Sequence, residues 1–459
     1  AATVPREKKH HNFVISKGNE QMNNSSSPSL RNQINENPMS FFQAATIALC
    51  TAINMLDGFD VLVMSFAASS VANKWNLAPS DLGILLSAGL VGMAIGSFWI
   101  APYADKIGRR PLVLFCLLLV TVGMLLSAVS QDRIQLSLLR FLTGLGIGGM
   151  LAALSALVSE YSSDLRRSLS MSILQSGYPL GAIMGGLVSV YLLQEFGWRS
   201  LFVFGGSVSL VMIPIVYWKL PESIDFLLLG KNPSALENVN RLTQKMRLAS
   251  ISVLHTKTIE SDLGYKILLS SQFRSNTVRL WIGYFCLMFA FYFVASWTPK
   301  MLVDAGLSTI QGVSAGIYLQ AGGLVGGIII GLLASRLKIT LLTSSYLMMC
   351  VISMLVYGFG NLSLFGLMLC ASIMGFFLGG AMIGLYAIAP GVYPASHRVT
   401  GIGSAIGLGR IGAIIAPFLG GWILEFGVET SQIITVFALP LIIASIAVSK
   451  IKLAGTLSE

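Results

Sequence analysis

Twelve apolar stretches of about 20 residues recur along the chain, and they constrain its fold more than any other feature. At a rise of about 1.5 Å per residue, a helix of that length crosses a hydrocarbon layer of roughly 30 Å. Only 11% of the 459 residues are charged, less than half of the roughly 25% that a soluble domain carries. The sequence therefore predicts an all-α integral membrane protein with twelve transmembrane helices. Their expected positions are 41–68, 82–103, 111–129, 134–159, 168–193, 199–218, 278–298, 310–334, 339–359, 362–390, 399–424 and 431–449.

The spans form two groups of six, separated by a charged stretch that contains no span. Because residue 1 is Ala, we expect residues 1–21 to derive from an expression tag and Met22 to be the native start. The expected segments are a disordered cytoplasmic tail at 1–40, an N-terminal six-helix bundle at 41–218, a cytoplasmic linker at 219–277, a C-terminal six-helix bundle at 278–450 and a cytoplasmic tail at 451–459.

The positions of Lys and Arg predict the orientation of the chain in the membrane. If both termini lie on one side, 24 of the 30 Lys and Arg residues lie on that side and 4 on the other. Positively charged loops remain in the cytoplasm, so both termini and the linker are expected there. The formal net charge of +10 is thereby explained without a nucleic-acid partner.

The two halves of the chain repeat one another. Gly148 has its counterpart at Gly379 and Arg167 has its counterpart at Arg398, both at the same offset along the chain. The triplet that begins at Glu195 also recurs in the second half, at almost the same offset. This pattern predicts two pseudo-symmetric six-helix bundles. Internal repeats are typical of secondary transporters, which bind their substrate near the middle of the membrane, between the repeats.

Two acidic residues lie in the middle of the first span, where charge is costly. Asp57 and Asp60 are three residues apart and share a helix face with Asn54, a candidate substrate contact. An ionised carboxylate near the bilayer centre costs about 2.5–3.5 kcal/mol on insertion scales, so the pair indicates a reversible proton site. The alternative is a pair at a helix end that is wetted from the external side.

Arg140 and Arg410 are the other charged residues inside the spans. A guanidinium stays protonated, and its planar fork can pair with a carboxylate through two hydrogen bonds. One arginine could hold an organic anion while the other neutralises the aspartates; alternatively, both are structural counter-ions without substrate contact. Glu160 ends the fourth span beside Arg166 and Arg167, and it is either half of a gate pair or a proton relay.

A short charged loop joins the second and third spans. It contains Asp105, Gly108, Arg109 and Arg110, and its charged groups can bridge neighbouring helix ends in one conformation and release them in another. We interpret these residues as a gate. The alternative is an ordinary, positively charged cytoplasmic loop.

Further polar and aromatic residues inside the spans are candidates for lining a substrate cavity, although packing accounts for most such residues. These candidates are Gln175, Tyr292, Tyr318, Gln320 and Tyr386. Glycine clusters at 144–149, 177–186 and 403–412 predict close helix contacts rather than nucleotide binding, because no strand precedes them. The five Cys residues have no paired spacing and no His lies in a span, so neither a metal site nor a cofactor is expected.

The whole chain after the tail resembles transporters of the major facilitator superfamily, and it is most similar to the aromatic acid:proton symporters. The motifs that carry the resemblance are Asp57-Gly58-Phe59-Asp60, the Ala104–Arg110 loop, Arg140 with the glycine run after it, Pro221-Glu222-Ser223, and the stretch from Tyr386 through Arg398 to Arg410. The resemblance implies uptake of benzoate-like carboxylates with protons across a bacterial inner membrane. It also implies roles in transport for the residues at matching positions, which are Asp57, Asp60, Arg140, Glu160, Arg398 and Arg410; we place Arg398 with the gate.

We therefore expect a symporter, not an enzyme, that imports an organic, aromatic carboxylate by alternating access, as a monomer surrounded by lipid. Two alternatives stay open. The sequence around Pro179 resembles an antiporter motif, and Ala101 stands where the loop motif usually has Gly, so a proton-coupled exporter of amphipathic compounds is one alternative. A non-transporting membrane sensor is the other, although no catalytic or metal cluster favours it.

Overall fold

The computed structural model describes residues 30–228, 235–251, 268–334, 336–393 and 397–453. Every regular element in these ranges is helical, and twelve of the helices are long and apolar enough to cross a membrane. The predicted all-α fold with twelve spans is confirmed. Residues 1–29 of the tail predicted at 1–40, residues 454–459 of the tail predicted at 451–459, and part of the linker lie outside the described residues. Within the first tail, Leu30–Glu36 forms a helix rather than the disordered segment that the sequence predicts.

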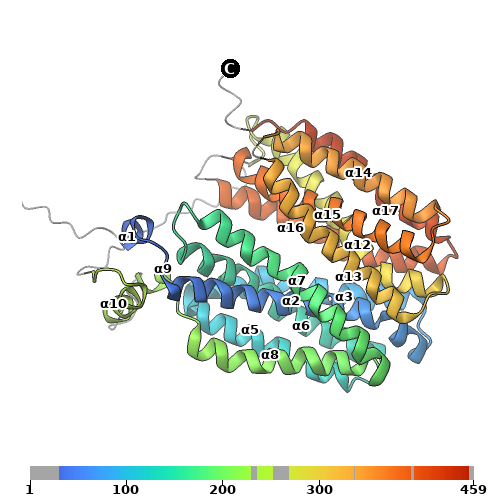
Figure 1. Ribbon diagram of the computed structural model, residues 1–459, viewed down its shortest axis with the longest axis horizontal. Helices are drawn as coiled ribbons and strands as arrows, with labels where there is room; N and C mark the ends of the chain where they lie inside the picture. The colour runs from blue at the N-terminus through green and yellow to red at the C-terminus, as the bar shows by residue number, and fades with distance from the viewer. Residues whose placement is uncertain (1–29, 229–234, 252–267, 335, 394–396, 454–459) are drawn as a thin grey trace, which may run out of the picture.

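The first six spans precede the linker. They are α2 (Phe41–Trp75), α3 (Pro79–Ile95) continued by η1 (Gly96–Ile100), η2 (Ala101–Tyr103) and α4 (Ala104–Ile107), α5 (Arg109–Ala128), α6 (Arg133–Glu160), α7 (Arg167–Glu195) and α8 (Arg199–Lys219). The last six spans are α12 (Arg274–Asp304), α13 (Thr309–Leu333), α14 (Ile339–Phe359), α15 (Leu364–Val392), α16 (Arg398–Glu425) and α17 (Thr430–Ser449). Three short helices, α1 (Leu30–Glu36), α9 (Ile224–Leu228) and α10 (Ala235–Met246), lie at one end of the first group (Figure 1).

Local sequence signals set several helix ends. Ser40 and Gln43 form a capping box that begins α2, and Ser308 and Gln311 form another that begins α13. Each box satisfies two backbone N–H groups that a helix start otherwise leaves without partners. Asn76 ends α2 in the left-handed conformation, at φ 47°, which Asn tolerates better than most residues.

Each group of six spans packs as one bundle, and the two bundles use the same helix pairs. In the first bundle α2 packs on α7, α3 on α6, and α5 on α8. In the second bundle the equivalent pairs are α12 on α16, α13 on α15, and α14 on α17. The repeated pairing confirms the two pseudo-symmetric bundles that the sequence repeat predicts.

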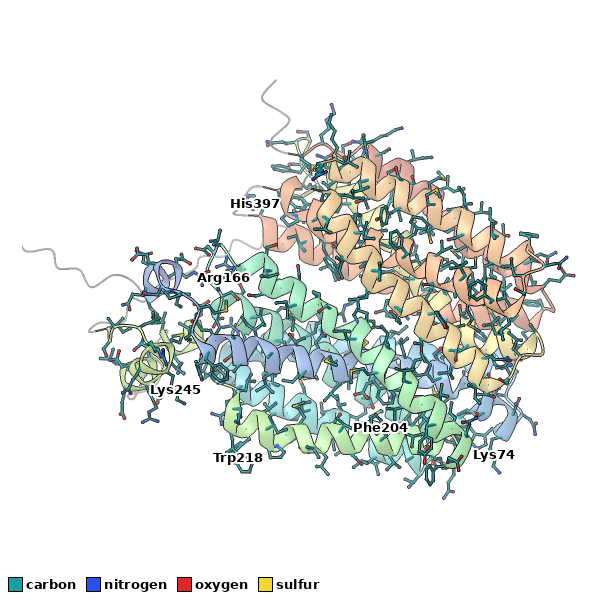
Figure 2. All side chains as sticks on the ribbon, in the orientation of Figure 1. Lys74, Arg166, Phe204, Trp218, Lys245 and His397 are labelled. Atoms are coloured by element: carbon teal, nitrogen blue, oxygen red, sulfur yellow. The ribbon has the colours of Figure 1, made fainter. Side chains whose placement is uncertain are left out.

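The spans have a terminus side, where the described chain begins and ends, and an opposite side. Arg166, Lys245 and His397 lie on the terminus side, and Lys74 lies on the opposite side (Figure 2). The bundles meet through α3 with α16, α7 with α13, and α2 with α12. Toward the terminus side, the ribbons of the two bundles diverge (Figure 1).

The contacts between the bundles lie in the opposite half of the molecule. The hydroxyl of Ser65 donates to the carbonyls of Ala295 and Ser296 at 2.9 and 2.8 Å, and the hydroxyl of Ser87 donates to the carbonyl of Ile414 at 3.0 Å. A Cβ added at Gly83 would lie 2.8 Å from the carbonyl oxygen of Pro417. The bundles are therefore closed against each other on the opposite side.

The glycine clusters only partly behave as predicted. In α6 and α7 they allow close helix contacts: a Cβ added at Gly148 would overlap α3 at Met93, and one added at Gly181 would overlap α2 at Met55. In α16, however, a Cβ added at Gly403 or Gly407 would meet no atom within 4 Å. The prediction of close contacts is wrong for these two residues, because they lie on the part of α16 where the bundles have separated.

Candidate functional site

The acidic pair is enclosed in the middle of α2. The exposed fractions of Asp57 and Asp60 are 3% and 1%, and none of their four carboxylate oxygens has a hydrogen-bond partner among the described residues. Gly58, between them, has no room for a side chain, because an added Cβ would overlap the carbonyl oxygen of Tyr178 in α7. The close contact between α2 and α7 thus encloses two carboxylates without providing donors for them.

Asn54 fixes this contact one turn earlier. Its amide Nδ2 donates to the carbonyl of Leu174 at 2.7 Å, and its exposed fraction is 2%. Asn54 therefore lies on the buried face of α2 that carries Asp57, but its amide donor is already used for the contact of α2 with α7.

Arg140 of α6 lies against the acidic pair but is held mainly by other groups. One guanidinium nitrogen donates to the main-chain carbonyl of Asp60, and the other lies 3.0 Å from the sulfur of Met124. The guanidinium also lies 5.8 Å from the centre of the Phe202 ring. No ion pair within 4 Å joins Arg140 to an aspartate side chain in the described part of the chain.

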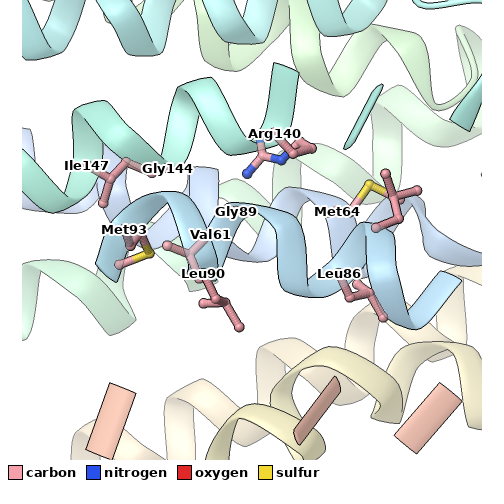
Figure 3. Close-up of a pocket in the computed structure, with 10 residues that line it drawn as sticks. Val61, Met64, Leu86, Gly89, Leu90, Met93, Arg140, Gly144 and Ile147 are labelled. Carbon is pink, nitrogen blue, oxygen red and sulfur yellow. The ribbon is translucent and has the colours of Figure 1, made fainter. Parts of the chain in front are cut away.

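A small cavity adjoins Arg140 between α2, α3 and α6. Its volume is about 10 Å³, close to what one water molecule needs. Met64, Gly89 and Met93 are among its lining residues, and Figure 3 shows Arg140 beside them. One of the lining residues, Met93, is also the contact of Arg410.

Arg410 reaches across the boundary between the bundles. From α16, its Nη1 donates to the carbonyl of Met93 in α3 at 2.9 Å, and its side chain is only partly buried. It is close enough to Tyr292 and Tyr386 to interact with both hydroxyls electrostatically. The ring of Tyr386 packs edge-on against Tyr284, with ring centres 5.8 Å apart.

Tyr178 is a site residue that the sequence analysis missed. Its hydroxyl is enclosed and has no hydrogen-bond partner among the described residues, and it interacts electrostatically with Tyr292 and Asp57. Tyr178 therefore belongs to the contact between α2 and α7 that encloses the acidic pair, because its carbonyl meets Gly58. The available signal was its position three residues after Gln175, on the same face of α7.

The remaining predicted cavity residues differ in placement. Gln320 is 4% exposed, and its Nε2 has no partner in the described structure. Gln175 is partly buried. Tyr318 is 48% exposed and shares a face of α13 with Val325 and Leu332, which are also exposed. The structure therefore does not bring Tyr318 together with the buried polar residues.

Glu160 lies far from the acidic pair, at the terminus side of α6. Twenty residues separate it from Arg140 along one helix, a distance of about 30 Å at 1.5 Å per residue. Its carboxylate pairs with Arg109 and accepts a hydrogen bond from the hydroxyl of Ser223 at 2.8 Å. Of the neighbours that the sequence suggests for it, Arg166 and Arg167, the second pairs with Asp164 at 2.6 Å instead.

The charged loop joins this network through its arginines. The backbone N–H groups of Arg109 and Arg110 donate to Oε1 of Glu222 at 2.7 and 3.2 Å. Gly108 has φ 99°, and an added Cβ would lie 2.5 Å from Glu222 Oε2, so only glycine fits there. Asp105 is 79% exposed and lies 3.8 Å from Arg109. The loop therefore contacts α6 and the residue before α9 through Arg109, and among the described residues the only ion pair of Asp105 is with Arg109 of α5.

Arg110 donates to the carbonyl of Tyr217 at the end of α8, while the side chain of Arg398 lies outside the described residues. Burial raises the pKa of the Tyr161 hydroxyl well above its usual value, so this group stays protonated and donates to the carbonyl of Glu222 at 2.7 Å. Within the described ranges, no group of three or more His, Cys, Asp or Glu side chains is placed to hold a metal ion.

Comparison with known proteins agrees with this arrangement. The Major Facilitator Superfamily profile matches residues 47–372. A gallate transporter of Pseudomonas putida is 32% identical over 426 residues, covering 91% of this chain and 94% of that protein. The 4-hydroxybenzoate transporter PcaK of Pseudomonas aeruginosa is 30% identical over 423 residues, covering 90% and 94%.

Among solved structures, a bacterial homolog of the human lysosomal transporter Spinster, in an inward-facing and unoccupied conformation, superposes with a TM-score of 0.68. It is 15% identical, and the match covers 90% of this chain and 97% of that one, so it supports the fold. On the profile match and the similarity to the gallate and 4-hydroxybenzoate transporters, the chain belongs to the major facilitator superfamily of membrane transporters.

Proposed function

We propose that the chain is a proton-coupled symporter that imports an aromatic carboxylate by alternating access. The substrates in the names of the similar transporters, gallate and 4-hydroxybenzoate, are both aromatic carboxylates. The observation that carries the proposal is the enclosed pair Asp57 and Asp60, whose carboxylate oxygens lack partners among the described residues. A separate arginine, Arg410, reaches from one bundle to the other.

Protons are the simplest means of neutralising the pair. An ionised carboxylate that loses water without gaining donors is strongly unfavourable, and two of them three residues apart repel each other. Arg140 offsets part of this charge, but its hydrogen bonds go to the Asp60 main chain and to Met124. A proton bound in this closed state and released in another would couple the bundle movement to proton flow.

Arg410 is the group that we assign to the substrate carboxylate. A guanidinium has five N–H donors, and the structure gives one of the Arg410 donors to Met93. The others are available beside Tyr292 and Tyr386, whereas Arg140 is buried and committed. Of the alternatives open at the sequence level, this favours Arg410 for the anion and Arg140 for the aspartates.

We further propose that the terminus side faces the cytoplasm of a bacterial cell and that the protein lies in the inner membrane. The excess of Lys and Arg on that side supports this orientation. Because the bundles are closed on the opposite side, the structure would then correspond to the inward-facing half of the cycle. The network of Arg109, Glu160 and Glu222 joins the first bundle to the start of the linker and involves no residue of the second bundle, so it remains intact in this state.

Uptake by proteoliposomes tests the coupling. With an acidic exterior, wild-type protein should accumulate radiolabelled 4-hydroxybenzoate or benzoate, and Asp57→Asn should abolish the accumulation. Asp304→Asn, which removes an exposed carboxylate beside Lys300, is the matched control and should behave as wild type. Accumulation by Asp57→Asn that does not depend on pH would refute proton coupling, and proton-driven movement of substrate outward would instead identify an exporter.

A further inference from the structure

We propose that the side-chain amide of Gln320 binds a hydroxyl group on the aromatic ring of the substrate, so that the transporter prefers hydroxylated aromatic acids to unsubstituted ones. This inference rests on the proposed function and deepens it. It assigns to a residue of α13 the choice between ring substituents, for which neither the two aspartates nor the two arginines account.

The first argument is that Gln320 has an unused donor. Its side chain is 4% exposed, and its Nε2 has no hydrogen-bond partner among the described residues. A buried donor without a partner costs about 1–3 kcal/mol, and buried amides in proteins are otherwise almost always paired. A group that arrives only with the substrate would provide the acceptor that this amide lacks.

The second argument is the position of Gln320 along its helix. It shares a face of α13 with Gly316 and Gly312, four and eight residues earlier. A Cβ added at Gly312 would lie 2.5 Å from the carbonyl of Pro299 in α12, and one added at Gly316 would lie 3.1 Å from the Phe66 ring in α2. This face of α13 is therefore directed toward α12 and α2, at the boundary between the bundles.

The depth of Gln320 in the membrane follows from the same contact. Because α12 and α13 are antiparallel, eight residues forward from Gly312 correspond to about eight residues back from Pro299. Gln320 therefore lies at about the level of Tyr292. Arg410 lies near the same level, because an added Cβ at Gly409 would meet Met288 of α12 and one added at Gly412 would meet Phe289. The amide and the guanidinium thus approach one region of the boundary from two different helices.

The chemistry of the two groups gives them different targets. The charged Arg410 is suited to the carboxylate, whereas the neutral amide of Gln320 is suited to a neutral oxygen, such as a phenolic hydroxyl. An unsubstituted ring would place a C–H group there and leave the amide unpaired. A site with such an unpaired donor discriminates strongly against the substrate that lacks the hydroxyl.

The test measures uptake by proteoliposomes of benzoate, 4-fluorobenzoate, 3-hydroxybenzoate and 4-hydroxybenzoate. Wild-type protein should transport the better hydroxybenzoate with a kcat/KM at least about tenfold higher than that of benzoate or 4-fluorobenzoate. Gln320→Met keeps an unbranched side chain of similar size and should reduce this ratio to about one. Gln194→Met makes the same change at an exposed position near the end of α7 and should leave the ratio unchanged.

The outcomes separate this inference from the proposed function. If the hydroxyl preference persists in Gln320→Met and Gln320→Leu, or if the wild type shows none, the inference is refuted while aromatic acid transport stands. If the wild type transports none of the four acids, the proposed function fails and the inference fails with it. If the variants transport none of the acids, the affinities of purified protein for the same acids are compared instead, by tryptophan fluorescence. A hydroxyl preference in binding that Gln320→Met abolishes supports the inference, and one that persists in this variant refutes it.

Discussion

Replacing Arg410 by glutamine should remove most of the affinity for the substrate carboxylate. The structure uses one donor of this guanidinium, for the carbonyl of Met93 at 2.9 Å, which leaves enough donors for a bidentate carboxylate pair. Each charged hydrogen bond contributes about 1.5–3 kcal/mol, so losing two costs about 3–6 kcal/mol. At about 1.4 kcal/mol per factor of ten, Arg410→Gln should weaken binding by about a hundredfold or more.

A second variant separates charge from geometry. Arg410→Lys keeps the positive charge but cannot form the planar two-bond pair, so the loss of one bond predicts a decrease of at least about tenfold. The assay is calorimetric titration of purified protein with 4-hydroxybenzoate.

Arg133→Gln is the control for this titration, because it breaks only a partly exposed pair with Asp81 at the opposite side. Such pairs contribute about 0–1 kcal/mol, and binding should be unchanged. If Arg410→Gln bound within about threefold of wild type while Arg133→Gln did the same, Arg410 would not be the carboxylate site.

The same contacts support three further predictions. Asp60→Asn should abolish substrate accumulation driven by a pH gradient but retain exchange of substrate across equal pH, as measured in proteoliposomes. Gly181→Ala should lower the melting temperature, because its Cβ would overlap Met55, whereas Gly407→Ala should leave it unchanged. Hydrogen bonds from Arg31 and Asn35 hold the pKa of Asp164 below its usual value, so the ionised form favours the docked α1. The contribution of the ionised Asp164 carboxylate to the docking of α1 is complete above pH about 4 and is lost as the pH falls through the lowered pKa. Hydrogen exchange in residues 30–36 would detect this loss.

The features that could be predicted from the sequence are those that the lipid environment imposes. Hydropathy predicted all twelve spans, because every backbone group in a membrane must be paired within a helix. The cost of intramembrane charge was sufficient to single out Asp57, Asp60, Arg140 and Arg410. The internal repeat predicted the two bundles and so placed these charges near their boundary.

The features that could not be predicted depend on which helix a side chain meets. Nothing in the sequence shows that the Asn54 amide is used by Leu174, or that Glu160 pairs with Arg109 rather than with the nearer Arg166. Tyr178 carries no charge, so the cost of burial did not single it out among thirteen tyrosines. Its place beside the acidic pair follows only from the crossing of α2 and α7, which brings its carbonyl against Gly58.

The polar contacts between the bundles suggest how substrate binding can move them. No ion pair joins the bundles in the part of the chain that the structure describes; the hydroxyls of Ser65 and Ser87 and the guanidinium of Arg410 make the hydrogen bonds across the boundary. Two neutral bonds of about 0.5–1.5 kcal/mol and one charged bond of about 1.5–3 kcal/mol sum to roughly 2.5–6 kcal/mol.

A ligand needs a differential affinity of about 5.5 kcal/mol to reverse a two-state equilibrium from 1:99 to 99:1. This is similar in magnitude to the sum of the hydrogen bonds across the boundary. A substrate carboxylate that pairs with the remaining donors of Arg410 would place its charge on one of the three side chains that join the bundles, while the bond to Met93 stays in place. Binding at this arginine would therefore act on the boundary itself, without a separate signal between the site and the boundary.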